Sequence, residues 1–231
     1  GVKGVVSGFF YRPVGPGPFP VVLVLHSRGG LGPNERSMSS WLAAQGYVAI
    51  APDYMTPVGV TPQTWESSFY VSHTDQIRED LGRGLDCLKS FPYVASDRIG
   101  VMGFSLGGYY SFVMGTREDV KAVVSWYGAI WGTPITGITR TPIRYWTSDM
   151  FAKMRASTLI LHGDSDTEPP VANASRARDL FLSAGKEVEL VVYPGVGHGW
   201  DCERCRGYVY HADVTADARA RTHAFFQAKL K

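Results

Sequence analysis

The sequence has few cysteines, little net charge and no long apolar run. Three Cys in 231 residues cannot build the disulfide framework of a small secreted protein. Lys and Arg total 23 against 21 Asp and Glu, so no basic stripe for nucleic acid and no polybasic membrane segment is expected. No apolar run approaches the roughly 20 residues that span a bilayer. A small-molecule partner is the remaining expectation.

The composition indicates one folded core. The chain is 45% hydrophobic and 19% charged, which is too apolar for a disordered protein. We see no internal repeat and no linker, so residues 1–231 are expected to form a single domain. The first residue is Gly1 rather than Met, as in a processed or trimmed chain. The sequence is compatible with a cytoplasmic protein and with a periplasmic or secreted one. The oligomeric state is likewise not decided by the sequence, and a monomer is plausible.

Apolar strand patterns alternate with amphipathic helix patterns along the chain. Strands are expected at 5–12, 20–26, 47–51, 99–104, 120–126, 158–162 and 188–193, and helices at 35–45, 75–91, 106–114, 171–184 and 214–230. Residues 55–69 are expected to form a surface loop, and 131–154 an irregular aromatic segment. The alternation predicts an α/β fold with a mostly parallel central sheet and helices on both of its faces.

Gly103-Phe104-Ser105-Leu106-Gly107 forms a G-x-S-x-G pattern between a predicted strand and a predicted helix. A nucleophile on a sharp strand-to-helix turn takes unusual φ and ψ values, and neighbours without a Cβ leave room for that turn. The helix after it aims free N–H groups at a developing oxyanion. A serine that merely sits in a β–α turn is the alternative. The flanking strand and helix favour Ser105 as a nucleophile.

A Ser, an Asp and a His follow three separate predicted strands. Ser105 comes first, Asp164 and Asp166 follow 158–162, and His198 lies in a Gly-flanked loop after the last strand. In parallel sheets, functional residues lie at the carboxyl ends of the strands. The order Ser, Asp, His along the chain is that of the α/β-hydrolases. An imidazole, with a pKa ordinarily near about 6.5, suits a general base at neutral pH. His198 is therefore the predicted base, against a surface His in a turn.

The chain resembles the dienelactone hydrolase-like branch of the α/β-hydrolases over nearly its whole length. The matching stretches are Phe19 to His26, Trp41 to Val48, Ala51 to Tyr54, Arg98 to Gly108, His162 to Asp166 and Gly197 to Gly199. The resemblance implies the α/β-hydrolase fold. It also favours Asp166, which matches the family motif, as the acid that orients His198. Asp164 is the alternative and would otherwise cap the turn.

Two departures from this family bear on the substrate. The name-giving enzymes carry a Cys nucleophile, where this chain has Ser105. They also carry a Glu and an Arg at places that correspond to Ser27 and Cys202. Both differences favour a general serine esterase that is similar to this family over true dienelactone hydrolysis.

An oxyanion hole for this chemistry needs two donors. The backbone N–H of Leu106, directly after the nucleophile, is one. The second is expected from the loop after His26, most naturally from the N–H of Arg28, with Ser27 as the alternative. The side chain of Arg28 is expected in solvent, although it could also meet a substrate carboxylate.

Five of the six Trp fall in or just before segments that follow predicted strands. Such residues are ordinarily core, yet their placement suggests an aromatic pocket for the acyl or alcohol group. The predicted substrate-binding residues are Tyr54, Trp126, Tyr127, Trp131 and Trp200, with Trp65 and Trp146 also on this rim.

Cys202 and Cys205 form a C-x-x-C just beyond His198. A short disulfide or two free thiols are favoured over a zinc site with His211, because no second ligand pair is present. Cys87 is expected to be buried on its helix.

These residues together predict a serine hydrolase that cleaves carboxylic esters through an acyl-enzyme, without metal or organic cofactor. A lactone hydrolase of dienelactone type and a small peptidase are the enzymatic alternatives. A catalytically silent α/β-hydrolase that binds a ligand is the alternative from another class. Such a protein would normally have lost one of the three side chains, and here all three are present.

Overall fold

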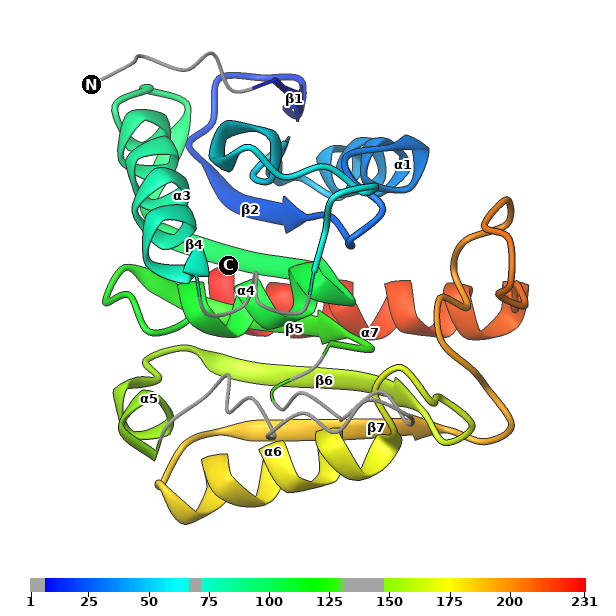
Figure 1. The fold of residues 1–231 in the computed structure, drawn as a ribbon. Helices are drawn as coiled ribbons and strands as arrows, with labels where there is room; N and C mark the ends of the chain where they lie inside the picture. The colour runs from blue at the N-terminus through cyan, green and yellow to red at the C-terminus, as the bar shows by residue number, and fades with distance from the viewer. Residues whose placement is uncertain (1–6, 67–71, 129, 131–147) are drawn as a thin grey trace.

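In the computed structural model, which describes residues 7–66, 72–128, 130 and 148–231, seven strands form one sheet with the order β1-β3-β2-β4-β5-β6-β7 (Figure 1). The strands are β1 (Gly8–Tyr11), β2 (Phe19–Leu25), β3 (Val48–Pro52), β4 (Val94–Phe104), β5 (Val120–Trp126), β6 (Ser157–Gly163) and β7 (Val188–Tyr193). β1 pairs antiparallel with β3, and every other neighbouring pair is parallel. The carboxyl ends of the parallel strands therefore share one edge of the sheet.

Both faces of the sheet are covered, which explains why its strands are apolar without alternation. In β2, Val21, Leu23 and Leu25 belong to one buried cluster, whereas Val22 and Val24 belong to a second cluster on the opposite face. Successive side chains of a strand point to opposite faces, so a strand between two helical layers needs apolar residues at every position. The predicted mostly parallel sheet is confirmed.

The helices divide between the two faces. They are α1 (Pro33–Ala44), α3 (Thr74–Lys89), α4 (Leu106–Met114), α5 (Ser148–Lys153), α6 (Val171–Ser183) and α7 (Ala212–Leu230), with a 3-10 turn η1 (Thr56–Val58). Leu42 of α1 and Phe226 of α7 lie in one cluster, and Leu85 of α3, Phe112 of α4 and Phe181 of α6 lie in the other. Figure 1 shows α6 in front of the sheet and α7 behind it.

Three local predictions are corrected by the structure. α5 lies inside the segment 131–154 that was expected to be irregular, and its Phe151 is buried against Phe181. β4 begins at Val94, five residues before the predicted strand start, because Val94 is buried and pairs with Phe19 of β2 ahead of a register shift in the ladder. Cys87 is exposed, since it points away from the apolar stripe of α3.

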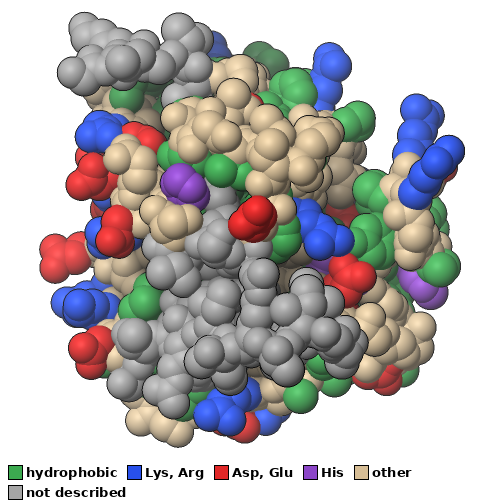
Figure 2. Space-filling model, viewed as in Figure 1, with side chains coloured by type: hydrophobic (Ala, Val, Ile, Leu, Met, Phe, Trp, Pro, Cys, Tyr) green, Lys and Arg blue, Asp and Glu red, His purple; other side chains and the backbone are tan. Residues whose placement is uncertain are grey.

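The surface carries mixed charge. Along one edge of the face shown in Figure 2, acidic and basic side chains alternate. Among the ion pairs of the surface is that of Lys89 with Asp86, on α3. Within the described part of the chain, no helix combines the length and the apolar character needed to cross a membrane.

Candidate active site

Ser105 lies at the tip of a sharp turn between β4 and α4. Its backbone has φ 53° and ψ −111°, a region that non-glycine residues rarely occupy. The glycines of the pattern are required by space. A Cβ on Gly103 would lie 2.1 Å from the carbonyl oxygen of Gly107, and a Cβ on Gly107 would lie 2.1 Å from the carbonyl oxygen of Leu25. The turn therefore packs directly against the end of β2, as the G-x-S-x-G pattern predicts for a raised nucleophile.

The structure brings Ser105, His198 and Asp166 into one hydrogen-bonded chain. The imidazole Nε2 of His198 lies 2.9 Å from Ser105 Oγ, and its Nδ1 lies 2.8 Å from Asp166 Oδ2. A carboxylate only accepts, so Nδ1–H donates to Asp166 and Nε2 is left to accept from the serine hydroxyl. The three side chains come from the ends of β4, β6 and β7. This is the arrangement of a nucleophile, its base and the acid that orients the base.

Asp166 is buried and surrounded by donors. Its Oδ1 accepts from the backbone N–H of Glu168 at 2.6 Å, and its Oδ2 also lies 3.3 Å from Nε2 of His162. Burial acts to raise the pKa of this carboxyl, but the hydrogen bonds from His162 and His198 outweigh it, so the pKa is lowered. Asp166 is consequently an anion at neutral pH.

Asp164, in the same turn, makes hydrogen bonds that connect two loops, and none of them is to His198. Its Oδ1 accepts from the backbone N–H of Gly195 at 2.7 Å and from the hydroxyl of Ser165 at 3.0 Å. These contacts tie the loop after β6 to the loop after β7. Asp164 thus occupies the turn-capping position that was its alternative interpretation.

The two expected oxyanion donors lie at equivalent places on neighbouring strands. Leu25 of β2 pairs with Gly103 of β4, and the strands are parallel. Arg28 and Leu106 each follow three residues later in the chain, so their backbone N–H groups emerge at the same edge of the sheet.

The orientation of the Arg28 N–H follows from the carbonyl that precedes it. The carbonyl oxygen of Ser27 accepts from Nδ1 of His26 at 2.7 Å and from the N–H of Gly30 at 3.1 Å. In a trans peptide the C=O and the next N–H point in opposite directions. The N–H of Arg28 therefore points away from His26 and Gly30, which leaves it free of the contacts that fix this loop.

His26 is a residue whose role the sequence did not reveal. It is fully buried, stacked on Tyr54 with ring centroids 4.0 Å apart, and its Nε2 lies 3.7 Å from Asp53 Oδ1. The contact with His26 holds the pKa of the Asp53 carboxyl well below its usual range. The contact with Asp53 could not be predicted, because the two residues are far apart in sequence. The one signal in the sequence was the position of His26 at the end of a predicted strand.

The side chain of Arg28 is paired rather than free in solvent. Its guanidinium lies 3.3 Å from Glu168 Oε2 and 5.7 Å from the ring centre of Trp65. Tyr208, whose ring contacts that of His198 at 5.4 Å, donates its hydroxyl to the same carboxylate at 3.4 Å. Arg28 and Glu168 are both about half exposed. A cation and an anion therefore sit together at the rim of the site.

The predicted aromatic pocket is corrected at several positions. Trp126 and Trp200 are fully buried in the core cluster that faces α7, and Trp126 Nε1 donates to Thr222 of that helix. Tyr54 is buried behind the loop after β2, where its hydroxyl donates to the carbonyl of His26 at 2.6 Å. These three aromatic residues are thus core residues, the ordinary alternative. Trp131 and Trp146 lie outside the described residues.

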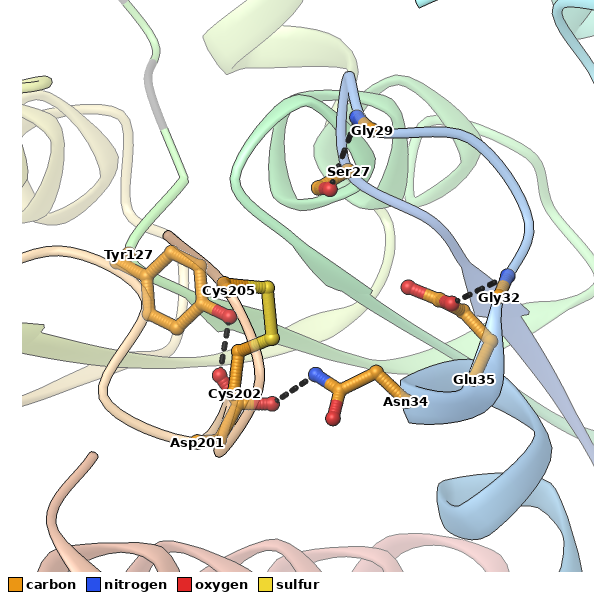
Figure 3. Close-up of a disulfide and its surroundings, with 9 residues drawn as sticks. All are labelled: Ser27, Gly29, Gly32, Asn34, Glu35, Tyr127, Asp201, Cys202 and Cys205. Atoms are coloured by element: carbon orange, nitrogen blue, oxygen red, sulfur yellow. Dashed lines mark hydrogen bonds between the residues drawn. A yellow bond between two sulfur atoms is a disulfide. The ribbon is translucent and has the colours of Figure 1, made fainter. Parts of the chain in front are cut away.

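Tyr127, also in the predicted set, contacts the candidate triad. Its ring packs edge-to-face against His198, with centroids 4.7 Å apart. Its hydroxyl donates to Asp201, and Asn34 Nδ2 donates to the other oxygen of Asp201 at 2.5 Å (Figure 3). The role of Asp201 was missed, because a single acid after Trp200 carries no motif.

Cys202 and Cys205 form a disulfide directly after Asp201 (Figure 3). Their thiols are therefore bonded to each other and not available to ligate zinc. Among the described residues, no group of three or more His, Cys, Asp or Glu side chains is arranged to hold a metal ion.

Comparison with known proteins places this geometry in a family. The model of the dienelactone hydrolase family matches residues 6–230. A relative from Synechocystis sp., named "Putative carboxymethylenebutenolidase", is 29% identical over 237 residues, covering 98% of this chain and 93% of that protein. These findings support a hydrolase of the α/β-hydrolase type.

Solved structures confirm the predicted fold. A "Putative Dienelactone Hydrolase" from Klebsiella pneumoniae superposes with a TM-score of 0.79 at 22% identity, over 97% of this chain and 99% of that one. A dienelactone hydrolase-like promiscuous phosphotriesterase from metagenomic libraries gives 0.75 at 16% identity, over 99% and 100%. At these identities the structures show the α/β-hydrolase fold, while the match over residues 6–230 shows more: the chain belongs to the dienelactone hydrolase family.

Proposed function

We propose that this protein is a serine hydrolase that cleaves carboxylic esters through an acyl-enzyme. The observation that carries the proposal is the chain from Ser105 Oγ to His198 Nε2 at 2.9 Å and from His198 Nδ1 to Asp166 at 2.8 Å. Both distances lie within the range that proton transfer and tautomer control require. A silent binding protein would have no need to hold all three groups in this geometry.

Each step of the proposed reaction has a group in the candidate site that can perform it. Ser105 Oγ attacks the ester carbonyl carbon while its proton passes to His198 Nε2, and Asp166 stabilises the imidazolium that forms. The N–H groups of Leu106 and Arg28 stabilise the negative carbonyl oxygen. Collapse expels the alcohol, which takes the proton from His198. Water then attacks the acyl group, again giving its proton to His198, and Ser105 is released with that proton.

The rim favours uncharged esters. Arg28, the cation nearest the oxyanion loop, already has Glu168 as its partner. A substrate carboxylate would have to compete with Glu168, and Ser27 and Cys202 supply no charge where the name-giving family enzymes carry Glu and Arg. The carboxylate-bearing lactone implied by the name of the Synechocystis relative is therefore the second candidate substrate. A peptide is a third, and its amine leaving group makes the greater demand on His198 as an acid.

The test is a nucleophile substitution. Ser105→Ala removes one hydroxyl, so the variant should fold, yet p-nitrophenyl butyrate turnover should fall by at least about 10³-fold, as in other triads. A fluorophosphonate should label the parent on Ser105 and leave the variant unlabelled. Ser165→Ala, in the exposed turn beside Asp164, is the matched control and should keep parent activity. A folded Ser105→Ala variant with normal turnover would refute the proposal.

A further inference from the structure

Tyr127 has an unusual backbone. Together with Ser105 it makes up the non-glycine residues with positive φ in the described ranges, at 43° and 53°. For a residue with a bulky side chain, this backbone conformation is strained. Such strain persists where the surroundings hold it in place, and it clusters at functional sites.

The backbone on both sides of Tyr127 is tied to the candidate triad. The N–H of Ser105 donates to the carbonyl of Trp126 at 3.0 Å, and the N–H of Tyr127 donates to the carbonyl of Leu161 at 2.8 Å. Trp126 ends β5, and Leu161 lies on β6, the strand that leads to Asp166. Tyr127 is therefore fixed between the strand that carries the nucleophile and the strand that carries the acid.

The side chain of Tyr127 is held at both ends. Its ring packs edge-to-face against His198 at 4.7 Å, and its buried hydroxyl donates to Asp201, three residues after His198. Asn34, on α1, donates to the second carboxylate oxygen (Figure 3). Asp201 is itself buried. The series Asn34, Asp201, Tyr127 and His198 thus links α1 to the imidazole through direct contacts.

We infer that Tyr127, held by Asp201, is a positioning residue that fixes the plane of the His198 imidazole. The inference rests on the proposed ester hydrolase. The hydrogen bond from Nδ1 to Asp166 fixes one atom of the ring but permits rotation about that bond. Such rotation would carry Nε2 away from Ser105 Oγ. The edge-to-face contact with Tyr127 opposes it, and the hydroxyl bond to Asp201 keeps the tyrosine side chain from swinging away from His198.

The first experiment compares Tyr127→Phe with a matched control. Tyr193→Phe removes a similar hydroxyl, which donates to Asp217 at 2.9 Å from a ring that contacts Trp200 rather than the triad. For Tyr127→Phe we expect kcat for p-nitrophenyl butyrate to fall about tenfold with KM within about twofold, because only the alignment of His198 is lost. Tyr193→Phe should keep the parent kcat, whatever its effect on thermal unfolding.

The second experiment separates hydrogen bonding from charge at Asp201. In Asp201→Asn the new amide oxygen can accept from Tyr127 and its NH₂ can donate to a flipped Asn34, so kcat should stay within about twofold of the parent. Asp201→Ala leaves the tyrosine hydroxyl without its partner and should lose as much kcat as Tyr127→Phe. Asn34→Ala should lower kcat in the same direction by a smaller factor, which provides a second route if either variant fails to fold.

The outcomes that overturn the inference are distinct from failure of the proposed function. Parent-like kcat in folded Tyr127→Phe would overturn it. So would equal losses in Asp201→Asn and Asp201→Ala together with a shifted pH profile of kcat/KM, because Asp201 would then act through its charge. Absence of ester turnover and fluorophosphonate labelling in the parent would instead refute the ester hydrolase itself.

Discussion

Two buried carboxylates flank the His198 loop, and their environments differ. Asp166 accepts from His198, from the backbone N–H of Glu168 and, at longer range, from His162. Asp201 accepts from the neutral hydroxyl of Tyr127 and the neutral amide of Asn34. Burial acts to raise the pKa of both. It is outweighed at Asp166, whose pKa is lowered, and it prevails at Asp201, whose pKa is raised.

The difference teaches what each carboxylate is suited to do. Asp166 stays an anion beside an imidazole that must carry a positive charge during turnover, so its value lies in its charge. Asp201 holds two neutral groups and gains little from being ionised. We expect the Asp166 side of the loop to govern catalysis through electrostatics and the Asp201 side to govern it through geometry.

The largest effect that tests this comparison is expected at Asp166. Asp166→Asn removes the charge and favours the wrong tautomer of His198, so kcat should fall by about 10²–10⁴-fold, by analogy with other triads. Asp164→Asn, in the same turn, should act mainly on stability through its bond to the N–H of Gly195. Steady-state kinetics and thermal unfolding of both variants check this. A catalytic loss at Asp164 with normal turnover at Asp166 would reverse the assignment.

The sequence predicted the Asp166 side of the loop better than the Asp201 side, for a physical reason. A sharp turn, a Gly-flanked histidine and an acid after a strand are local features, and they indicated Ser105, His198 and Asp166. The bond between Tyr127 and Asp201 joins residues 74 positions apart, and the contact of His26 with Asp53 depends on how β2 and β3 are paired.

In the fold, too, local features were predicted better than contacts between distant parts of the chain. Boundaries of α4, β5 and β7 agree with the predicted ranges, because each element is mostly apolar and ends close to a Gly or Pro. The environments of the aromatic residues were harder to predict, since a Trp that lines a pocket and a Trp that fills a core have the same sequence pattern. Trp126 is fully buried because α7, far along the chain, covers it.

A smaller effect is expected from substrate charge on the Asp166 side. We expect the parent to prefer p-nitrophenyl butyrate over the p-nitrophenyl monoester of succinic acid by about tenfold in kcat/KM. The reason is that Arg28 is already paired with Glu168 and does not attract the succinate carboxylate strongly. Glu168→Gln should narrow this preference, and Arg28→Gln, which keeps its backbone N–H, should widen it. Both shifts should shrink at high salt, because the pair is half exposed. Preference of the parent for the succinate ester would contradict this assignment.

The smallest expected effect is on the free energy of unfolding. Its dependence on pH should have opposite signs for Asp166 and Asp201. The pKa of Asp166 is lowered from 3.8, so its contribution to the free energy of unfolding is present above that value and is lost as pH falls through the folded pKa. The pKa of Asp201 is raised from 3.8 by burial, so folding is favoured at low pH and loses stability as pH rises through the folded pKa.

Parent and variants should therefore diverge in opposite directions. As pH rises from about 3 to about 8, the parent should gain stability relative to Asp166→Asn and lose stability relative to Asp201→Asn. A titration that spans both the folded and the unfolded pKa amounts to about 1.4 kcal/mol for each unit of pKa difference. Urea unfolding at several pH values measures both trends. Each substitution controls for the other, because both replace a buried carboxylate with an amide on the same loop system. Parallel trends would mean that the environments of Asp166 and Asp201 are electrostatically alike, and the division between charge and geometry would not hold.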